Sequence, residues 1–418
     1  MVSQLVMAAT GLMSARWLGP SGKGLVAATT TWGQLLGWFA GLGVALAIQV
    51  RVSEAPATGK TAVTSTALGN GLLFSAVAGT GVGLIAFFPL ARSLAHLGPE
   101  STAVVALAVI PLPLNVLAQV LAFLQLALGR NRLYSISLVL GPLTTLALVL
   151  TAAAAGKLSP VVLILCYLVG AMFALSASAR QLPWGSIHAD LAVLWQDIRY
   201  GIRFWLSGVM SLVNLRLDIL VMTTYLTARD IGLYSAANNV MLPVSSIPAA
   251  IALITTSKSA RLQVQGGPGS AIAAIWGSSR QSFILSLAGG FVLAVLAPVV
   301  VPLVLGDAYR PSIPIIWILI TGNIARSVMG VIVAGANGMR RPRAGYVSEG
   351  IGLAATLILL PVLLPRWGIA GAAITSSVSY CLAAAASMRW LFLARRSSIA
   401  ANDGKGQQAR GANGGGAA

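Results

Sequence analysis

An apolar stretch over residues 312–337 carries a polar face that could bind an anion. Asn323, Arg326, Gly330 and Asn337 follow one another at steps of three, four and seven residues, which places them on one face of a helix. An arginine on such a face can hold a phosphate, because its planar guanidinium donates paired hydrogen bonds. No acidic residue stands three or four positions from Arg326, so no ion pair along the helix is predicted.

A second polar face lies in residues 202–226. Ser207, Ser211, Asn214 and Asp218 follow at steps of four, three and four residues, again on one side of a helix. Such a stripe fits the wall of a water-filled cavity, because polar groups facing lipid are costly. A cavity wall is the favoured interpretation, and hydrogen bonds between helices inside the C-lobe are the alternative that stays open.

Arg216 is the other charge in that stretch. Two residues on a helix correspond to a turn of about 200°, so Arg216 cannot share a face with Asp218. Arg216 is predicted either to contact cargo or to pair with Glu349. In the first half of the chain, Asn115 and Gln119 share a face of residues 102–128 and offer hydrogen bonds without charge.

The composition identifies the elements that must position these residues. Of 418 residues, 57% are hydrophobic and 9% are charged, against about 25% charged in a soluble domain. This excludes a soluble enzyme, a secreted disulfide scaffold and a disordered chain, and predicts an all-α polytopic membrane protein. Twelve spans are predicted, at 1–16, 24–50, 64–90, 102–128, 134–155, 160–179, 202–226, 232–256, 281–305, 312–337, 346–365 and 369–393.

Basic residues set the expected orientation. Of the 27 Lys and Arg, 18 fall in the loops after even-numbered spans and at the C-terminal end, and 7 in the loops after odd-numbered spans. Lys and Arg accumulate on the cytoplasmic side, so both termini are predicted to be cytoplasmic. The first span is short, which predicts either a short helix or a start that lies upstream.

The two halves of the chain correspond at an offset of 208–209 residues. Phe74 falls on Phe283, Pro89 on Pro298, and the other matched pairs are Trp17 with Tyr225, Gly24 with Gly232, Gly129 with Gly338, Lys157 with Arg366 and Arg180 with Arg389. Six spans per repeat predict a parallel repeat with the site between the halves. The expected organisation is an N-lobe (1–180), an interfacial linker helix (181–201) capped by Asp190, a C-lobe (202–393) and a disordered tail (394–418).

Four short segments resemble one family of transporters. They are Ala15-Arg16-Trp17-Leu18-Gly19-Pro20 followed by Gly24, Asp230-Ile231-Gly232-Leu233-Tyr234-Ser235-Ala236-Ala237 preceded by Leu217-Asp218, Gly306-Asp307-Ala308-Tyr309, and Gly368-Ile369-Ala370-Gly371-Ala372-Ala373. In order and spacing they resemble the Wzx-type O-unit flippases, of the superfamily that also holds MATE drug exporters and lipid II flippases.

The resemblance implies a two-lobe fold of twelve to fourteen helices. It also implies a function: alternating access moves an oligosaccharide on undecaprenyl pyrophosphate across the bacterial cytoplasmic membrane, within membrane lipid and beside other polysaccharide-assembly proteins. Neither a cofactor, a metal nor nucleic acid is expected. The expected site is asymmetric, with sugar contacts at Asn115 and Gln119 in one lobe and anion contacts around Arg326 in the other.

Three alternatives fit less well. A cation-coupled MATE-like exporter would favour an acidic residue in spans 1 to 6, where the only carboxylates, Glu54 and Glu100, fall in loops. A major-facilitator transporter would carry a basic signature loop after span 2, where the chain reads Arg51-Val52-Ser53-Glu54-Ala55-Pro56. A glycan polymerase or ligase would need a large outer loop with an acid–base pair. A carrier is therefore predicted, and not an enzyme.

Overall fold

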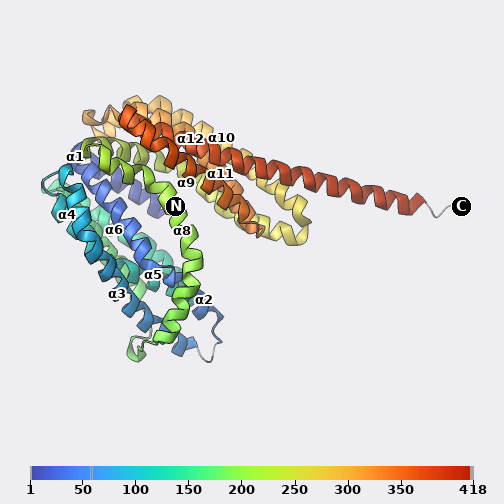
Figure 1. Ribbon diagram of the computed structural model, residues 1–418, viewed down its shortest axis with the longest axis horizontal. Helices are drawn as coiled ribbons and strands as arrows, with labels where there is room; N and C mark the ends of the chain where they lie inside the picture. The colour runs from blue at the N-terminus through green and yellow to red at the C-terminus, as the bar shows by residue number, and fades with distance from the viewer. Residues whose placement is uncertain (1, 57, 59, 415–418) are drawn as a thin grey trace. The chain divides into compact units, whose positions relative to one another are not determined.

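Helices make up nearly all of the computed structural model, which describes residues 2–56, 58 and 60–414. Side chains at positions 2, 186, 203, 204, 206–208, 210, 211, 214 and 397–414 lie outside this description. Twelve α-helices are found in the described residues, and these contain no strand: α1 (Val2–Gly41), α2 (Val44–Glu54), α3 (Lys60–Leu94), α4 (Ser101–Val109), α5 (Leu112–Ala127), α6 (Asn131–Ala154), α7 (Pro160–Ala179), α8 (Leu191–Tyr225), α9 (Ala228–Gln265), α10 (Gly267–Leu305), α11 (Ser312–Gly338) and α12 (Arg343–Gly414) (Figure 1).

The helices are long and apolar enough for a membrane protein. Within the described residues, eight helices meet the length and hydropathy of a membrane span, and a ninth forms if the bent pair Ser3–Gly41 and Val44–Glu54 is one span. The backbone also breaks inside α1 at Gly19 (φ 67°) and inside α12 at Gly368 (φ 54°), where glycine tolerates a positive φ. These breaks fall between predicted spans 1 and 2 and between predicted spans 11 and 12. Twelve spans remain a prediction.

Local signals account for several helix ends. Asp190 begins α8 as the sequence predicted, because its carboxylate accepts hydrogen bonds from the backbone N–H groups of Ala192 and Val193. Ser159 caps α7 in the same way, with Pro160 at the first helical position, where a missing N–H costs nothing. The helix begun at Asp190 continues unbroken to Tyr225, so the stripe expected for a linker helix forms the first turns of α8.

Special backbone positions recur at the repeat offset. Gly98 (φ 155°) and Gly306 (φ 97°) are 208 residues apart, and each adjoins a 3₁₀ turn, Ala95–Leu97 and Asp307–Tyr309. The break at Gly19 corresponds in the same way to Thr227, which lies between α8 and α9. Superposition of the halves as two six-helix lobes stays a prediction.

The two helices that carry Gly24 and Gly232, one matched pair of the repeat, pack closely together at these glycines. A methyl group built on Gly24 would overlap the carbonyl oxygen of Ala228, and one built on Gly232 would overlap that of Pro20. Both pairs are related by the 208-residue offset. Helices α1 and α9 therefore approach each other backbone to backbone at these positions, which only glycine permits at this distance.

The chain divides into two compact units. Unit 1 comprises Met1–Val240, Pro298–Ile313 and Leu364–Ile369. Its core joins α2, α3 and α5 through Val44, Ile48, Leu68, Val116, Val120, Leu121 and Leu124. Leu194 from the start of α8 enters the same core, whereas Leu191 and Trp195 are exposed.

Unit 2 comprises Met241–Ala297, Pro314–Leu363 and Ala370–Ala418. Its core joins α10, α11 and α12 through Ala271, Ile272, Ile275, Val328, Ile332, Met339, Leu391 and Ala394. The tail that composition predicts to be disordered is continuous with α12 as far as Gly414.

Candidate functional site

Unit 1 contains a cavity of about 460 Å³ between α1, α5 and α7. Asn115 and Gln119 line it from α5, as neighbours one turn apart. Gln34 from α1 and Tyr167 from α7 line the same cavity. The sequence places the first two on one face, and the fold adds the other two. Its volume lies within the roughly 300–1,000 Å³ of small-molecule pockets.

The amides of this cavity are available for a ligand. Within the described residues, the side chains of Gln34, Asn115 and Gln119 have no hydrogen-bond partner, and none of the described lining residues is charged. Thr30 differs, because its hydroxyl donates to the carbonyl of Val26 at 2.6 Å. Amides that stay accessible must be satisfied by water or a ligand. The cavity therefore offers donors and acceptors of the kind that hydroxyl groups bind.

A helix break lies beside the cavity, between α4 and α5. Pro111 and Pro113 have no N–H, so neither can donate to the carbonyl oxygen four residues earlier, on Leu107 and Val109 respectively. Leu107 and Pro111 both line the cavity. Irregular backbone of this kind is tolerated at membrane depth where it lines a polar space.

Arg326 belongs to unit 2 and is half-buried on α11. Its guanidinium carbon lies 5.7 Å from the centre of the Tyr380 ring of α12, a cation–π contact that leaves the N–H groups at the rim of the guanidinium for hydrogen bonds. A methyl group built on Gly330, one turn further, would meet nothing within 4 Å. Open space therefore adjoins this face of α11.

The two asparagines of the same face differ. The Oδ1 atom of Asn323 accepts a hydrogen bond from the Ser245 hydroxyl at 3.0 Å, which joins α11 to α9 within unit 2. Asn337 is exposed. Asn323 thus stabilises the helix packing beside Arg326.

Asp218 pairs with another helix of unit 1. Its Oδ2 atom accepts a hydrogen bond from the hydroxyl of Tyr234, a fully buried residue of α9. This contact is the interhelical alternative for the stripe on α8. Asn214 lies in that stripe, but its side chain is outside the described residues.

Arg216 lies on a different face of α8 from Asp218, because two residues along a helix correspond to a turn of about 200°. Its Nε atom is buried, with no hydrogen-bond partner among the described residues. Glu349 belongs to unit 2, so pairing between the two stays a prediction, as does a cargo contact. An unsatisfied guanidinium nitrogen is costly to bury.

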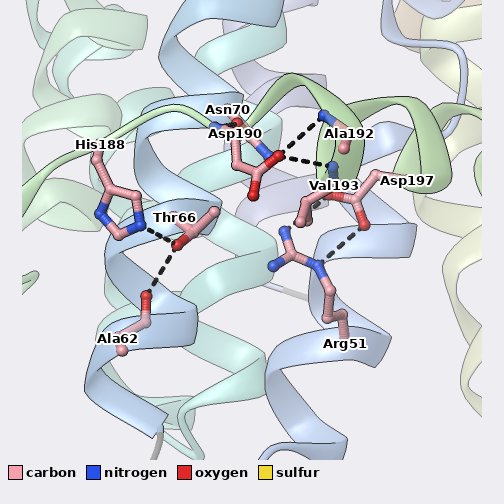
Figure 2. A network of polar contacts seen from close by, with 9 residues as sticks. All are labelled: Arg51, Ala62, Thr66, Asn70, His188, Asp190, Ala192, Val193 and Asp197. Carbon is pink, nitrogen blue, oxygen red and sulfur yellow. Dashed lines mark hydrogen bonds and ion pairs between the residues drawn. The ribbon is translucent and has the colours of Figure 1, made fainter.

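A network of polar contacts ties the start of α8 to α2 and α3 (Figure 2). Arg51 donates two hydrogen bonds to the carboxylate of Asp197, at 3.0 and 2.7 Å. The Oδ1 atom of Asn70 accepts from the backbone N–H of Asp190 at 2.8 Å. The ring Nε2 of His188 lies 2.7 Å from the Thr66 hydroxyl, which itself donates to the Ala62 carbonyl.

This network is structural in character. Burial raises the pKa of Asp197, and the Arg51 guanidinium opposes that rise. A cavity of about 630 Å³ adjoins the network, and its charged lining residues are Arg51, Glu54, Asp190 and Asp197. Arg51 and Asp197 are held in the ion pair and Asp190 caps α8, so these three charges already have protein partners. The sequence signalled Arg51 only as a basic loop residue.

Comparison with known proteins identifies relatives in sequence and in fold. The profile of a family described as polysaccharide biosynthesis protein matches residues 13–314. No protein with a curated function is significantly similar in sequence.

Solved structures share the fold across nearly the whole chain. An inward-facing multidrug resistance MATE transporter of the MOP superfamily is 14% identical, with a TM-score of 0.78 over 94% of this chain and 95% of that one. The lipid II flippase MurJ in an inward closed conformation is 11% identical, with a TM-score of 0.78 over 95% and 89%. A MOP superfamily transporter from Pyrococcus furiosus is 13% identical, with a TM-score of 0.64 over 95% and 94%.

Proposed function

Because the chain belongs to the polysaccharide biosynthesis protein family, we propose that it flips a polyprenyl-pyrophosphate-linked oligosaccharide across a membrane by alternating access. Membership of the family supports a role in polysaccharide biosynthesis. The fold shared with MurJ and MATE transporters supports a transporter architecture. Such a cargo needs a polar space for its head group, because neither sugar nor pyrophosphate enters hydrocarbon. The tail stays in lipid throughout.

The cavity of unit 1 carries this proposal. Its accessible amides at Gln34, Asn115 and Gln119 match sugar hydroxyls, which donate and accept hydrogen bonds. Arg326 is the proposed pyrophosphate ligand, since a guanidinium without an acidic partner in the described residues suits an anion. Asp218 and Arg216 are not among the residues that line this cavity, and contact of Asp218, Arg216 and Asn214 with the cargo is a separate proposal.

A cation-coupled exporter is the alternative within the same fold. That chemistry favours a carboxylate beside the N-terminal cavity, and none of the described lining residues is acidic. A glycan polymerase or ligase is the alternative from another class. We favour a carrier over an enzyme because Asn, Gln and Tyr side chains bind sugars but do not form an acid–base pair.

The proposed location is the bacterial cytoplasmic membrane, with both termini in the cytoplasm. The distribution of Lys and Arg supports this orientation. Single cysteines at Lys157 and Arg310 should react with an impermeant reagent added from outside, and cysteines at Arg130 and Arg341 should not. The reverse pattern would overturn the orientation.

Flipping in reconstituted vesicles tests the function. Proteoliposomes would hold a fluorescent undecaprenyl-pyrophosphate-linked oligosaccharide, and a membrane-impermeant enzyme would report the fraction in the outer leaflet. We expect protein-dependent exchange of this cargo and none of a fluorescent lipophilic cation. Exchange of the cation alone would favour the exporter, and lengthening of the oligosaccharide would favour the polymerase.

A further inference from the structure

A second, apolar groove adjoins the polar cavity of unit 1. It measures about 270 Å³ and lies between the α4–α5 break and α7, lined by Ile110, Leu114, Ala118, Met172 and Leu175 together with residues of the polar cavity. Ile110 is 71% exposed and Met172 51% exposed, so the groove opens onto the apolar surface of the helices. In a membrane this surface faces hydrocarbon.

The two spaces share a wall. Leu107, Pro111, Asn115, Leu168 and Ala171 line both of them. Asn115 is the only polar side chain among these five, and its amide has no partner within the described residues. A molecule bound beside Asn115 can therefore extend a polar part towards Gln119 and an apolar part along Ala118 and Met172.

The α4–α5 break creates this junction. The two prolines interrupt the helix at Ile110 and Pro111, and the chain exposes Ile110 on the groove side. The small side chains of Ala118 and Ala171 leave the floor of the groove low. A continuous helix with larger side chains would close the passage between cavity and surface.

We propose that this groove is a lateral exit for the single isoprenoid tail of the cargo, with sugars of its head group in the polar cavity. The inference rests on the proposed function and adds where the tail leaves unit 1. An amphiphile with one apolar chain suits the site, because the groove is apolar throughout except at Asn115. The tail then stays in hydrocarbon while the head group is enclosed, so no apolar surface crosses the polar space.

Photocrosslinking at two adjacent positions tests this inference. Benzoylphenylalanine would replace Met172 in the groove or, as the control, Phe173, which is 49% exposed and lines neither space. The protein would be reconstituted in phosphatidylethanolamine and phosphatidylglycerol with undecaprenyl pyrophosphate. We expect Met172→benzoylphenylalanine to capture several times more polyprenyl lipid than the control. Equal capture of polyprenyl lipid at both positions would overturn the inference and leave a groove filled by bulk lipid.

A filling substitution provides the functional test. Ala118→Trp should obstruct the groove and slow flipping by about tenfold, equivalent to 1.4 kcal/mol. Ala147→Trp on α6, outside both spaces, is the control, and Ala118→Leu should give an intermediate rate. Normal flipping by a folded Ala118→Trp variant would reject the exit while the proposed function stands. Absence of flipping by the unsubstituted protein would reject the proposed function itself.

Discussion

Helices α5 and α11 are predicted to be equivalent in the two halves of the chain, yet they present different chemistry. Asn115 and Asn323 are 208 residues apart, as are Ala118 and Arg326, within the 208–209-residue offset of the two halves. One turn of α5 thus borders an apolar groove where the equivalent turn of α11 carries a cation. Under the proposed function, sugar and anion binding would be divided between the two halves of the chain.

The two asparagines show that equivalence in sequence is not equivalence in role. Asn323 accepts a hydrogen bond from Ser245, so its amide serves packing. Asn115 has no such partner among the described residues and faces a cavity. The neighbouring helix, and not the residue type, decides whether an asparagine serves helix packing or faces a cavity.

The largest effect is expected at the Arg51–Asp197 pair, which has no ion pair at the position 208 residues further along the described chain. Arg51→Ala should lower the free energy of unfolding by about 3 kcal/mol at neutral pH, at the low end for a broken buried pair, because Arg51 is 25% exposed. Ser259 stands at the equivalent position and bonds the Gly335 carbonyl, so Ser259→Ala should cost only about 1 kcal/mol. Thermal unfolding in detergent measures both.

The same variant should depend on pH in a definite direction. Burial raises the pKa of Asp197, and in Arg51→Ala no guanidinium opposes that rise. The folded variant then binds a proton at Asp197 at a higher pH than the unfolded chain does. Its destabilisation should be full above the folded-state pKa and shrink as the pH falls through it. A penalty independent of pH would contradict this role of Asp197.

Substitution of Arg326 tests whether α11 binds the anionic part of the cargo. Arg326→Ala should slow flipping by about ten- to hundredfold, since a charge-assisted contact contributes roughly 1.5–3 kcal/mol. Arg326→Lys should retain part of the activity, because a point charge replaces the planar fork. The exposed Arg280 of α10 supplies the control Arg280→Ala. Normal flipping by Arg326→Ala, at normal membrane abundance, would make the residue architectural.

The glycine contact tests whether the halves are true repeats. Gly24→Ala and Gly232→Ala should each destabilise the protein by about 1–3 kcal/mol, because the added methyl meets backbone that cannot yield easily. Similar losses are expected for the two variants. Gly81→Ala on α3 is the control, since its methyl meets open space and helical Gly→Ala stabilises by up to about 1 kcal/mol. Melting temperatures distinguish these outcomes.

The smallest effect separates the two asparagines. Asn115→Ala should weaken apparent cargo affinity by about fivefold, the worth of one net hydrogen bond of about 1 kcal/mol, without changing the melting temperature. Asn323→Ala should lower the melting temperature and leave the apparent cargo affinity unchanged. The loss of stability should be small, because the Ser245 hydroxyl keeps its hydrogen bond to the Met241 carbonyl. Titration of the flipping rate with cargo, beside a melting curve, measures both. If the two variants weakened cargo affinity equally, the distinction between a cargo-binding Asn115 and a packing Asn323 would be wrong.

Sequence alone determined the local features. Composition gave an all-helical membrane protein, Asp190 marked the start of α8, and periodicity placed Asn115 with Gln119 and Asn323 with Arg326. These inferences work because capping and helical spacing depend on residues within one or two turns. Repeat landmarks such as Gly24 and Gly232 were also visible as an offset.

Only the tertiary structure decided which side chains meet across helices. Gln34 and Tyr167 are far apart in sequence but line one cavity with Asn115. Asp218 reaches Tyr234, and Arg51 reaches Asp197, 146 residues away. Periodicity assigns a residue to a face, but the partner of that face depends on how helices pack, and in a chain this uniformly apolar many packings satisfy the same pattern.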